Sequence, residues 1–181
     1  MKGAPTPLSG LTVMEPDVFE DERGYLYESF SQRAFEEATG EQRTWVQDNH
    51  SYSRRDVLRG LHYQLDVPQG KIVRCIRGAV FDVAVDVRRS SPTFGEWFGI
   101  ELSAENRAML WVPEGFAHGF LVTTDIAEVT YKMTEHYQPD GNRAIRWNDP
   151  DLAIPWPIEG APILSPNDAA APFLAEAETY A

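Results

Sequence analysis

The chain has little cysteine, few basic residues and no long apolar run, and each shortage excludes a class of protein. A single cysteine among 181 residues excludes an internal disulfide and is typical of a reducing compartment. Because only 16 basic residues stand against 28 acidic ones, the net charge of −12 argues against a nucleic-acid binder, which needs a basic face. No apolar run approaches the ~18 residues of a membrane span, and the first residues lack the apolar core of a signal peptide. The sequence therefore predicts a cytoplasmic protein that binds neither nucleic acid nor membrane.

Helix signals are also scarce. The length fits one full-sized core, so we expect a single domain over residues 1–181. One helix is predicted at 32–39, because Ser31 can cap its start and Gly40 can end it. A second short helix is expected near 168–179, and the rest of the chain favours strands.

Alternation of apolar and polar residues marks the strands. In 78–88, Phe81, Val83 and Val85 share one face and Asp82 lies on the other, a half-buried alternation typical of an antiparallel strand. Other extended segments are expected at 11–19 (interrupted by Pro16), 25–30, 45–51, 57–64, 71–77, 96–102, 109–112, 116–123, 127–134 and 143–147. Many short strands with Gly and Pro turns predict an all-β sandwich, barrel or jelly roll, and the pattern does not choose among them.

His62 stands on the segment 57–64 between two cations, Arg59 and Lys71. A titratable imidazole beside fixed positive charge suits an anionic ligand that has an acidic proton to remove. The alternative is a hydrogen-bonded histidine on a sheet surface, and the residues alone leave both interpretations open. The polar side chains of 45–51 likewise either face solvent or line a binding cleft.

Two segments, Gly60–Gln64 and Pro113–His118, resemble the half-motifs of the cupin superfamily, a jelly-roll group. In metal cupins the first half-motif supplies a second histidine and a nearby glutamate. Here Gln64 stands at the second histidine, and no glutamate occurs between His62 and Glu96. Fewer ligands remain than the three that a catalytic metal normally has, so we expect the jelly roll without the metal.

A longer resemblance, from about Phe19 to Pro172, is to the dTDP-4-dehydrorhamnose 3,5-epimerases, a family of metal-independent jelly-roll enzymes. Eight motifs of that family occur in order: Phe-x-Asp-x-Arg-Gly at 19–24, Val-Gln-Asp-Asn-His-Ser at 46–51, Val-Leu-Arg-Gly-Leu-His-Tyr-Gln at 57–64, Phe-Asp-Val-Ala-Val-Asp-Val-Arg at 81–88, Ser-Pro-Thr-Phe-Gly at 91–95, Trp-Val-Pro-Glu-Gly-Phe-Ala-His-Gly-Phe at 111–120, Tyr-Lys at 131–132 and Ile-x-Trp-Asn-Asp at 145–149. The resemblance implies an all-β, cupin-type jelly roll with a few short helices, acting as an isomerase without a cofactor.

The reaction that the resemblance implies converts dTDP-4-keto-6-deoxy-D-glucose to dTDP-4-keto-L-rhamnose by inverting C3 and C5, in dTDP-L-rhamnose biosynthesis. Both carbons flank the C4 ketone, so loss of either proton gives an enolate. In the family's pattern His62 is the base and Asp168 orients it. Tyr131 is the proton donor, and Lys71 is the cation beside the enolate oxygen. From the residues alone, a helix N-cap is the preferred interpretation of Asp168, and an ordinary strand tyrosine that of Tyr131.

The resemblance also implies how the substrate is held. Positions around the diphosphate and the sugar are matched by Arg59 and His118. The family's nucleotide-binding positions are matched by Arg23, Glu28, Gln47 and Asn49, and its thymine-stacking position is matched by Tyr137. The family forms homodimers in which N-terminal strands cross to the partner, and the early strand with Pro16 is compatible with that arrangement.

Three alternatives stay open at this stage. Some relatives invert only C3 or only C5 with the same base and acid, and Asn142 and Asn167 depart from a close relative that has Glu and Lys there. A metal-dependent cupin would use His62 and His118. A non-catalytic sugar-nucleotide binding module would have no use for a base and acid pair.

Overall fold

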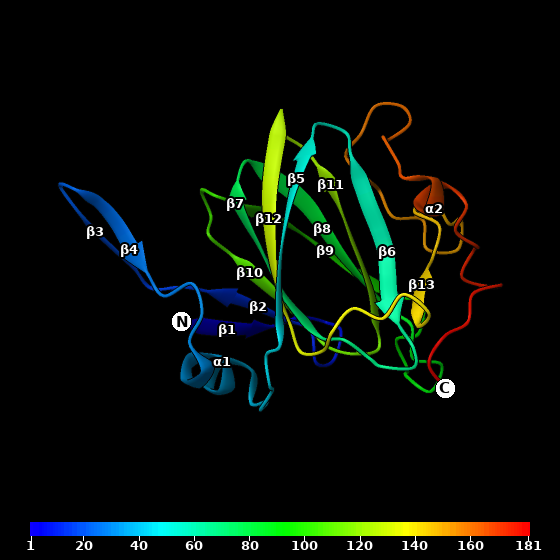
Figure 1. Ribbon diagram of the computed structural model, residues 1–181, viewed down its shortest axis with the longest axis horizontal. Coiled ribbons are helices and arrows are strands. Elements are labelled where there is room, and N and C mark those ends of the chain that lie inside the picture. Colours follow the sequence, from blue (N-terminus) through cyan, green and yellow to red (C-terminus); the bar gives the residue numbers. More distant parts are fainter.

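The computed structural model describes residues 1–181, and almost all of its regular structure is β-strand (Figure 1). None of its helices combines the length and the apolar character needed to cross a bilayer. In chain order the elements are β1 (Lys2–Pro5), β2 (Thr12–Glu15), β3 (Val18–Asp21), β4 (Gly24–Tyr27), α1 (Gln32–Thr39), β5 (Gln47–Arg54), β6 (Leu58–Gln64), β7 (Lys71–Arg77), β8 (Ala79–Asp86), β9 (Trp97–Ser103), β10 (Met109–Val112), β11 (Phe116–Val122), β12 (Ile126–Met133), β13 (Asn142–Ala144) and α2 (Pro166–Ala169).

Two antiparallel sheets form the body of the protein. The six-stranded sheet has the order β1-β2-β10-β7-β12-β5, and the five-stranded sheet has the order β13-β6-β11-β8-β9. The strands β3 and β4 pair only with each other, in a hairpin that projects away from both sheets (Figure 1). The prediction of an all-β, cupin-type jelly roll with a few short helices is confirmed.

The main core lies between the sheets and contains residues such as Val73, Phe120 and Val129, which are at most 1% exposed. The helix α1 covers part of the outer face of the six-stranded sheet, where Phe35 packs edge-on against Trp111 with ring centroids 5.1 Å apart. Its predicted bounds are confirmed, because Ser31 accepts a hydrogen bond from the Ala34 amide at its start.

A second core lies on the outer face of the five-stranded sheet, under the C-terminal segment. Leu152, Trp156 and Leu174 of that segment pack with Val83 and Val85 of β8. As a result β8 is buried on both faces, so the expected half-burial is wrong even though the antiparallel pairing is right. The polar face of β8 looks into the interior of the jelly roll rather than into solvent.

Two terminal segments differ from the sequence-based expectations. The strand β1 was not predicted, and it exists because it pairs with β2 across a turn. The helix expected near 168–179 is wrong, since α2 is a single turn that ends at Ala169. Pro172 accounts for the early end, because proline disfavours helical backbone at the residue before it and supplies no amide hydrogen. The interruption of the segment 11–19 at Pro16 is confirmed.

Candidate active site

A cavity of about 610 Å³ is bounded by strands of both sheets and by the C-terminal segment. This volume is in the usual range for small-molecule sites, and only 5 of its 18 lining residues are hydrophobic, which suits a polar ligand. Most of the site residues predicted from the sequence line it, namely Asn49, Arg59, His62, Lys71, His118, Tyr131, Tyr137 and Asp168.

His62 faces the cavity because of the strand period of β6. Leu61 and Tyr63 point into the C-terminal core, so the alternating neighbours His62 and Gln64 point to the opposite face. The Nε2 atom of His62 lies 2.5 Å from Oδ1 of Asp168, and the histidine side chain is 39% exposed. With Nε2 donating to the carboxylate, the second ring nitrogen of a neutral imidazole carries the lone pair.

Asp168 is held in place by the short helix α2. The N-cap of this helix is Ser165, whose Oγ accepts from the Asp168 amide and donates to Oδ2 of the same aspartate at 2.7 Å. Burial alone would raise the pKa of Asp168, but hydrogen bonds from His62 and Ser165 hold it below its ordinary value. The carboxylate therefore stays ionised beside the imidazole.

A second histidine–aspartate pair lies behind the first. The Nε2 atom of His118 is 2.9 and 3.0 Å from the two carboxylate oxygens of Asp82, and His118 stands opposite His62 in the ladder between β11 and β6. Burial lowers the pKa of His118, although Asp82 opposes the shift. Burial also lowers the pKa of Lys71 to about 8, and Asp82 again opposes it.

Tyr131 approaches the cavity from the opposite sheet. It lies on β12, its hydroxyl is 3.4 Å from Oγ of Ser51, and its ring meets that of His118 edge-on at 6.3 Å. Burial raises its pKa, so the phenol is protonated at neutral pH. A proton acceptor on one sheet thus shares a cavity with a proton donor on the other.

Several polar residues at one edge of the cavity are ordered by hydrogen bonds from neighbouring side chains. Gln47 donates from Nε2 to Oδ1 of Asn49 at 2.8 Å and accepts from the Tyr137 amide at 3.1 Å. Gln47 itself does not line the cavity, but it orders two residues that do. Arg59 donates from Nε to Oγ of Ser53 at 3.0 Å. The side chain of Tyr137 lies at the cavity mouth, where the residue is 53% exposed.

Arg23 and Glu28 are not brought to this cavity. Both belong to the region of the projecting hairpin, and the Arg23 side chain is 85% exposed and paired only with Asp21 of the same turn (Figure 1). If they serve a nucleotide site, it is not the one formed by their own chain.

Several lining or supporting residues were missed in the sequence. They are Asp82, Ser51, Ser165, Gln64 and Gln69. Asp82 had a signal, since an aspartate within the apolar strand Val80–Val85 must be paired if both faces are buried. The others are common polar residues whose role depends on contacts far along the chain.

No group of three or more His, Cys, Asp or Glu side chains is placed to hold a metal ion. The Gln64 side chain, at the place of a metal cupin's second histidine, is bonded to backbone atoms of Val67, His136 and Gln138. That activity needs no metal stays a prediction.

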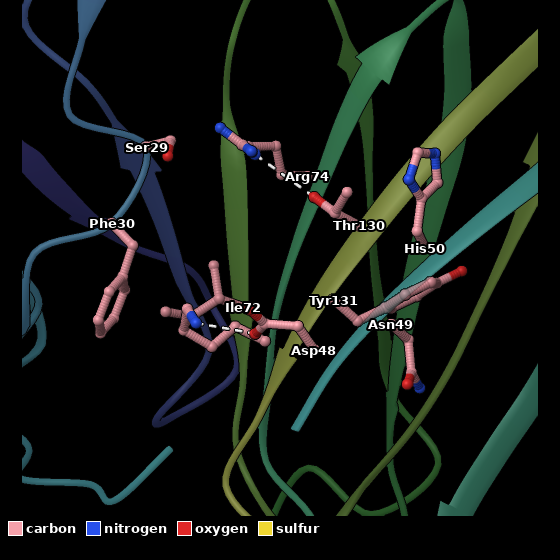
Figure 2. A pocket seen from close by; sticks show the side chains of 10 residues that line it. Ser29, Phe30, Asp48, Asn49, His50, Ile72, Arg74, Thr130 and Tyr131 are labelled. Carbon is pink, nitrogen blue, oxygen red and sulfur yellow. Dashed lines mark hydrogen bonds and ion pairs between the residues drawn. The ribbon is translucent and has the colours of Figure 1, made fainter. Parts of the chain in front are cut away.

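A second, smaller groove of about 390 Å³ lies on the outer face of β5, β7 and β12. Figure 2 shows Ser29 and Phe30 on one side of it and Arg74, Thr130 and His50 on the other. Lys132 also lines the groove and donates to Asp48 at 2.8 Å. The groove contains the cations Arg74 and Lys132, of which Lys132 is paired with Asp48.

Comparison with known proteins agrees with this geometry. Residues 5–176 match the family model described as dTDP-4-dehydrorhamnose 3,5-epimerase. The chain is 52% identical to the enzyme of that name from Pseudomonas aeruginosa over 99% of both chains. It is 53% identical to that from Salmonella typhimurium over 95% of this chain and 94% of the relative.

A solved structure shares the fold almost throughout. It is a crystal structure of dTDP-6-deoxy-D-glucose-3,5-epimerase from Legionella pneumophila in complex with dTDP-4-keto-L-rhamnose. Its TM-score is 0.94 at 48% sequence identity, covering 97% of this chain and 93% of the other. On these matches, the chain belongs to the dTDP-4-dehydrorhamnose 3,5-epimerase family of isomerases.

Proposed function

We propose that the chain epimerises dTDP-4-keto-6-deoxy-D-glucose at C3 and C5, giving dTDP-4-keto-L-rhamnose for dTDP-L-rhamnose biosynthesis. The names of relatives that are more than half identical over nearly the whole chain support this reaction. The proposal rests on the placement of His62 and Tyr131 on opposite sheets around one cavity, which Lys71 also lines. Inverting a carbon requires removal of a proton from one side and its return from the other.

The proposed mechanism begins with proton abstraction. The free nitrogen of His62 takes the proton from C3 or C5, and the C–H electron pair moves into the ring to give an enolate with its charge on the C4 oxygen. Asp168 stabilises the imidazolium that forms, as the carboxylate does in a catalytic triad. Lys71, when protonated, stabilises the charge on the enolate oxygen.

The mechanism ends with reprotonation from the opposite side. The Tyr131 hydroxyl gives its proton to the carbon, and the enolate electron pair returns to form the inverted C–H bond while the ketone is restored. Solvent exchange at the open cavity then returns a proton to the tyrosinate and removes one from His62. The sequence of steps is redox-neutral, and repetition at the second carbon completes the product.

An assay with a trapping reductase tests the reaction. The protein is incubated with dTDP-4-keto-6-deoxy-D-glucose, an NADPH-dependent ketoreductase for the L-sugar and NADPH. Formation of dTDP-L-rhamnose is the expected result. Recovery of unchanged substrate would contradict the proposal, and a product inverted at one carbon would make the enzyme a mono-epimerase.

We also propose a homodimer in which the hairpin of β3 and β4 reaches the partner's cavity. The hairpin exposes apolar surface that a monomer would leave in water, with Phe19 68% and Leu26 74% exposed. Glu22 at the tip of the hairpin complements Arg74 in the groove of Figure 2, which borders the cavity, and neither residue has a charged partner within its own chain. Such a dimer would bring Arg23 and Glu28 to a nucleotide.

Complementation tests whether Arg23 acts across the dimer. Subunits with Arg23→Ala and with His62→Ala are co-expressed under two tags, and the mixed dimer is purified. If Arg23 serves the partner's cavity, the mixed dimer contains one complete site and recovers about half of the wild-type activity. A mixed dimer as inactive as the His62→Ala parent, or a monomeric mass in solution, would contradict the arrangement.

A cytoplasmic location is proposed as well. It rests on the unpaired, buried Cys75, which suits a reducing compartment. Fractionation of native cells, with the protein followed by antibody, should recover it with cytosolic markers, and recovery outside the cytosol would contradict this assignment.

A further inference from the structure

We infer that Gln64 is a positioning residue that holds the segment 135–138, and with it Tyr137, over the mouth of the cavity. The inference rests on the proposed function and on the thymine-stacking position that the family resemblance implies for Tyr137. Gln64 is 3% exposed and stands two residues after His62 on β6. Gln64 would then link the strand that carries His62 to the segment that contacts the nucleotide.

The segment 135–138 belongs to no strand or helix, so its backbone needs other hydrogen-bond partners. Gln64 provides them on both sides of Tyr137. Its Nε2 donates to the His136 carbonyl at 3.3 Å, and its Oε1 accepts from the Gln138 amide at 2.7 Å. The same Nε2 donates to the Val67 carbonyl at 2.9 Å, which ties the segment to the loop before Lys71.

Two more glutamines complete the arrangement. Gln69 donates from Nε2 to the Glu135 carbonyl at 2.5 Å, and Gln47 accepts from the Tyr137 amide at 3.1 Å. Every residue from 135 to 138 therefore has a backbone atom bonded to a glutamine side chain. Gln64 is the buried member and the one with two bonds to the segment, so its loss should loosen Tyr137 most.

A segment that is already ordered loses little freedom when a ligand binds, which favours affinity. The expected consequence of loosening it is weaker nucleotide binding with intact chemistry, since His62, Lys71 and Tyr131 are held by other contacts. Gln64→Leu should raise KM and the Kd for dTDP about tenfold, while kcat stays within about twofold of wild type. Gln64→Glu keeps an oxygen that accepts from the Gln138 amide. Its second oxygen, however, would face the carbonyls of Val67 and His136 in place of the donating nitrogen, so this variant should also raise KM and the Kd for dTDP.

A double-mutant cycle with Tyr137→Ala separates positioning from a general structural role. If Gln64 acts through Tyr137, Gln64→Leu in the Tyr137→Ala background should change KM by less than about twofold. The control is Gln32→Leu, which removes similar amide bonds to Glu36 and the Arg43 carbonyl outside the cavity lining, and KM should not change.

Either of two results would overturn the inference: a full tenfold effect of Gln64→Leu without Tyr137, or a loss in kcat that equals the rise in KM. Thermal melting identifies any variant that fails to fold, and Gln64→Glu, with the same volume, then replaces the leucine variant. Calorimetry with dTDP keeps the test independent of turnover. If the wild-type protein shows no turnover, the proposed function is contradicted. If the Gln64 variants bind dTDP with unchanged affinity, the inference about Gln64 is contradicted.

Discussion

Two histidines on neighbouring strands are each paired with an aspartate, and the pairs differ in how far solvent reaches the imidazole. In the pair of His62 with Asp168 the histidine side chain is 39% exposed, whereas in the pair of His118 with Asp82 it is 5% exposed. Both pairs join Nε2 to a carboxylate that is almost fully buried. Because burying an unbalanced charge is costly, burial lowers the pKa of the His118 imidazole.

The difference shows how one pair of side chains serves two purposes in the same fold. At the cavity, His62 can exchange a proton with a ligand while Asp168 supports the charge that forms. Behind it, burial lowers the pKa of His118, and Asp82 also raises the pKa of Lys71 against the effect of burial. In the proposed mechanism the outer pair transfers the proton, and the inner pair supports the cation Lys71.

The largest effect should follow from removing the exposed imidazole. His62→Asn should lower kcat about 10³-fold or more, since general acid–base catalysis contributes about 10² to 10⁴ and no other base lines the cavity in the same place. His118→Asn should lower kcat less than His62→Asn does and should mainly raise KM. Steady-state kinetics with the trapping reductase checks both, and near-normal turnover of the His62 variant would remove the proposed mechanism.

A smaller loss should follow from neutralising the carboxylate of the outer pair. Asp168→Asn leaves the base in place but no longer stabilises its protonated form, so kcat should fall roughly 10²-fold with little change in KM. Asp125→Asn, at an exposed carboxylate paired with Arg55, is the control and should leave kcat unchanged. Equal kcat values for the two variants would place Asp168 outside the mechanism.

The pH profile should report the cation supported by the inner pair. With its pKa lowered to about 8, Lys71 loses its charge as the pH rises through that value, and kcat should fall with it. Asp82→Asn removes the carboxylate that raises this pKa, so the alkaline fall in kcat should move to lower pH. An unmoved or higher alkaline limit in a folded Asp82→Asn protein would contradict this role.

The lowered pKa of Lys71 also predicts how the free energy of unfolding changes with pH. In the unfolded chain Lys71 has its ordinary pKa of 10.5, whereas burial lowers its pKa to about 8 in the folded protein. The unfolded state then binds more protons between these values, so this group makes the free energy of unfolding rise with pH across that window. Denaturant titrations of wild type and Lys71→Met should differ in slope there.

The smallest effect should come from chelation. No group of three or more metal ligands is present, and the outer and inner histidines are each bonded to an aspartate. Dialysis against EDTA should leave kcat unchanged, as measured by the trapping assay. Loss of activity that zinc or iron restores would favour a metal-dependent cupin instead.

Local signals in the sequence were enough for much of the fold. Ser31 and Gly40 set the helix α1, and Pro16 divides the first strand, because capping and proline geometry act within a few residues. Burial of β8 on both faces could not be foreseen, since it depends on Leu152 and Leu174 folding back over the sheet.

The candidate site also contains some residues that could be predicted from the sequence and others that could not. Spacing alone could not pair His62 with Asp168, which lie 106 residues apart, and only the family resemblance suggested it. Neither pattern nor resemblance gave Asp82 or Gln64 a role in the site, and their partners are a buried imidazole and three backbone atoms. Such contacts follow from the closure of the two sheets around the cavity.

The most direct test of the account is an NMR measurement of dTDP-4-keto-6-deoxy-D-glucose incubated in deuterated water with wild type and with His62→Ala. The account predicts deuterium at both C3 and C5 with the wild-type protein and at neither carbon with the variant. Exchange by the variant at a rate near wild type, or no exchange by a wild-type protein that binds dTDP, would contradict the assignment of His62 as the base.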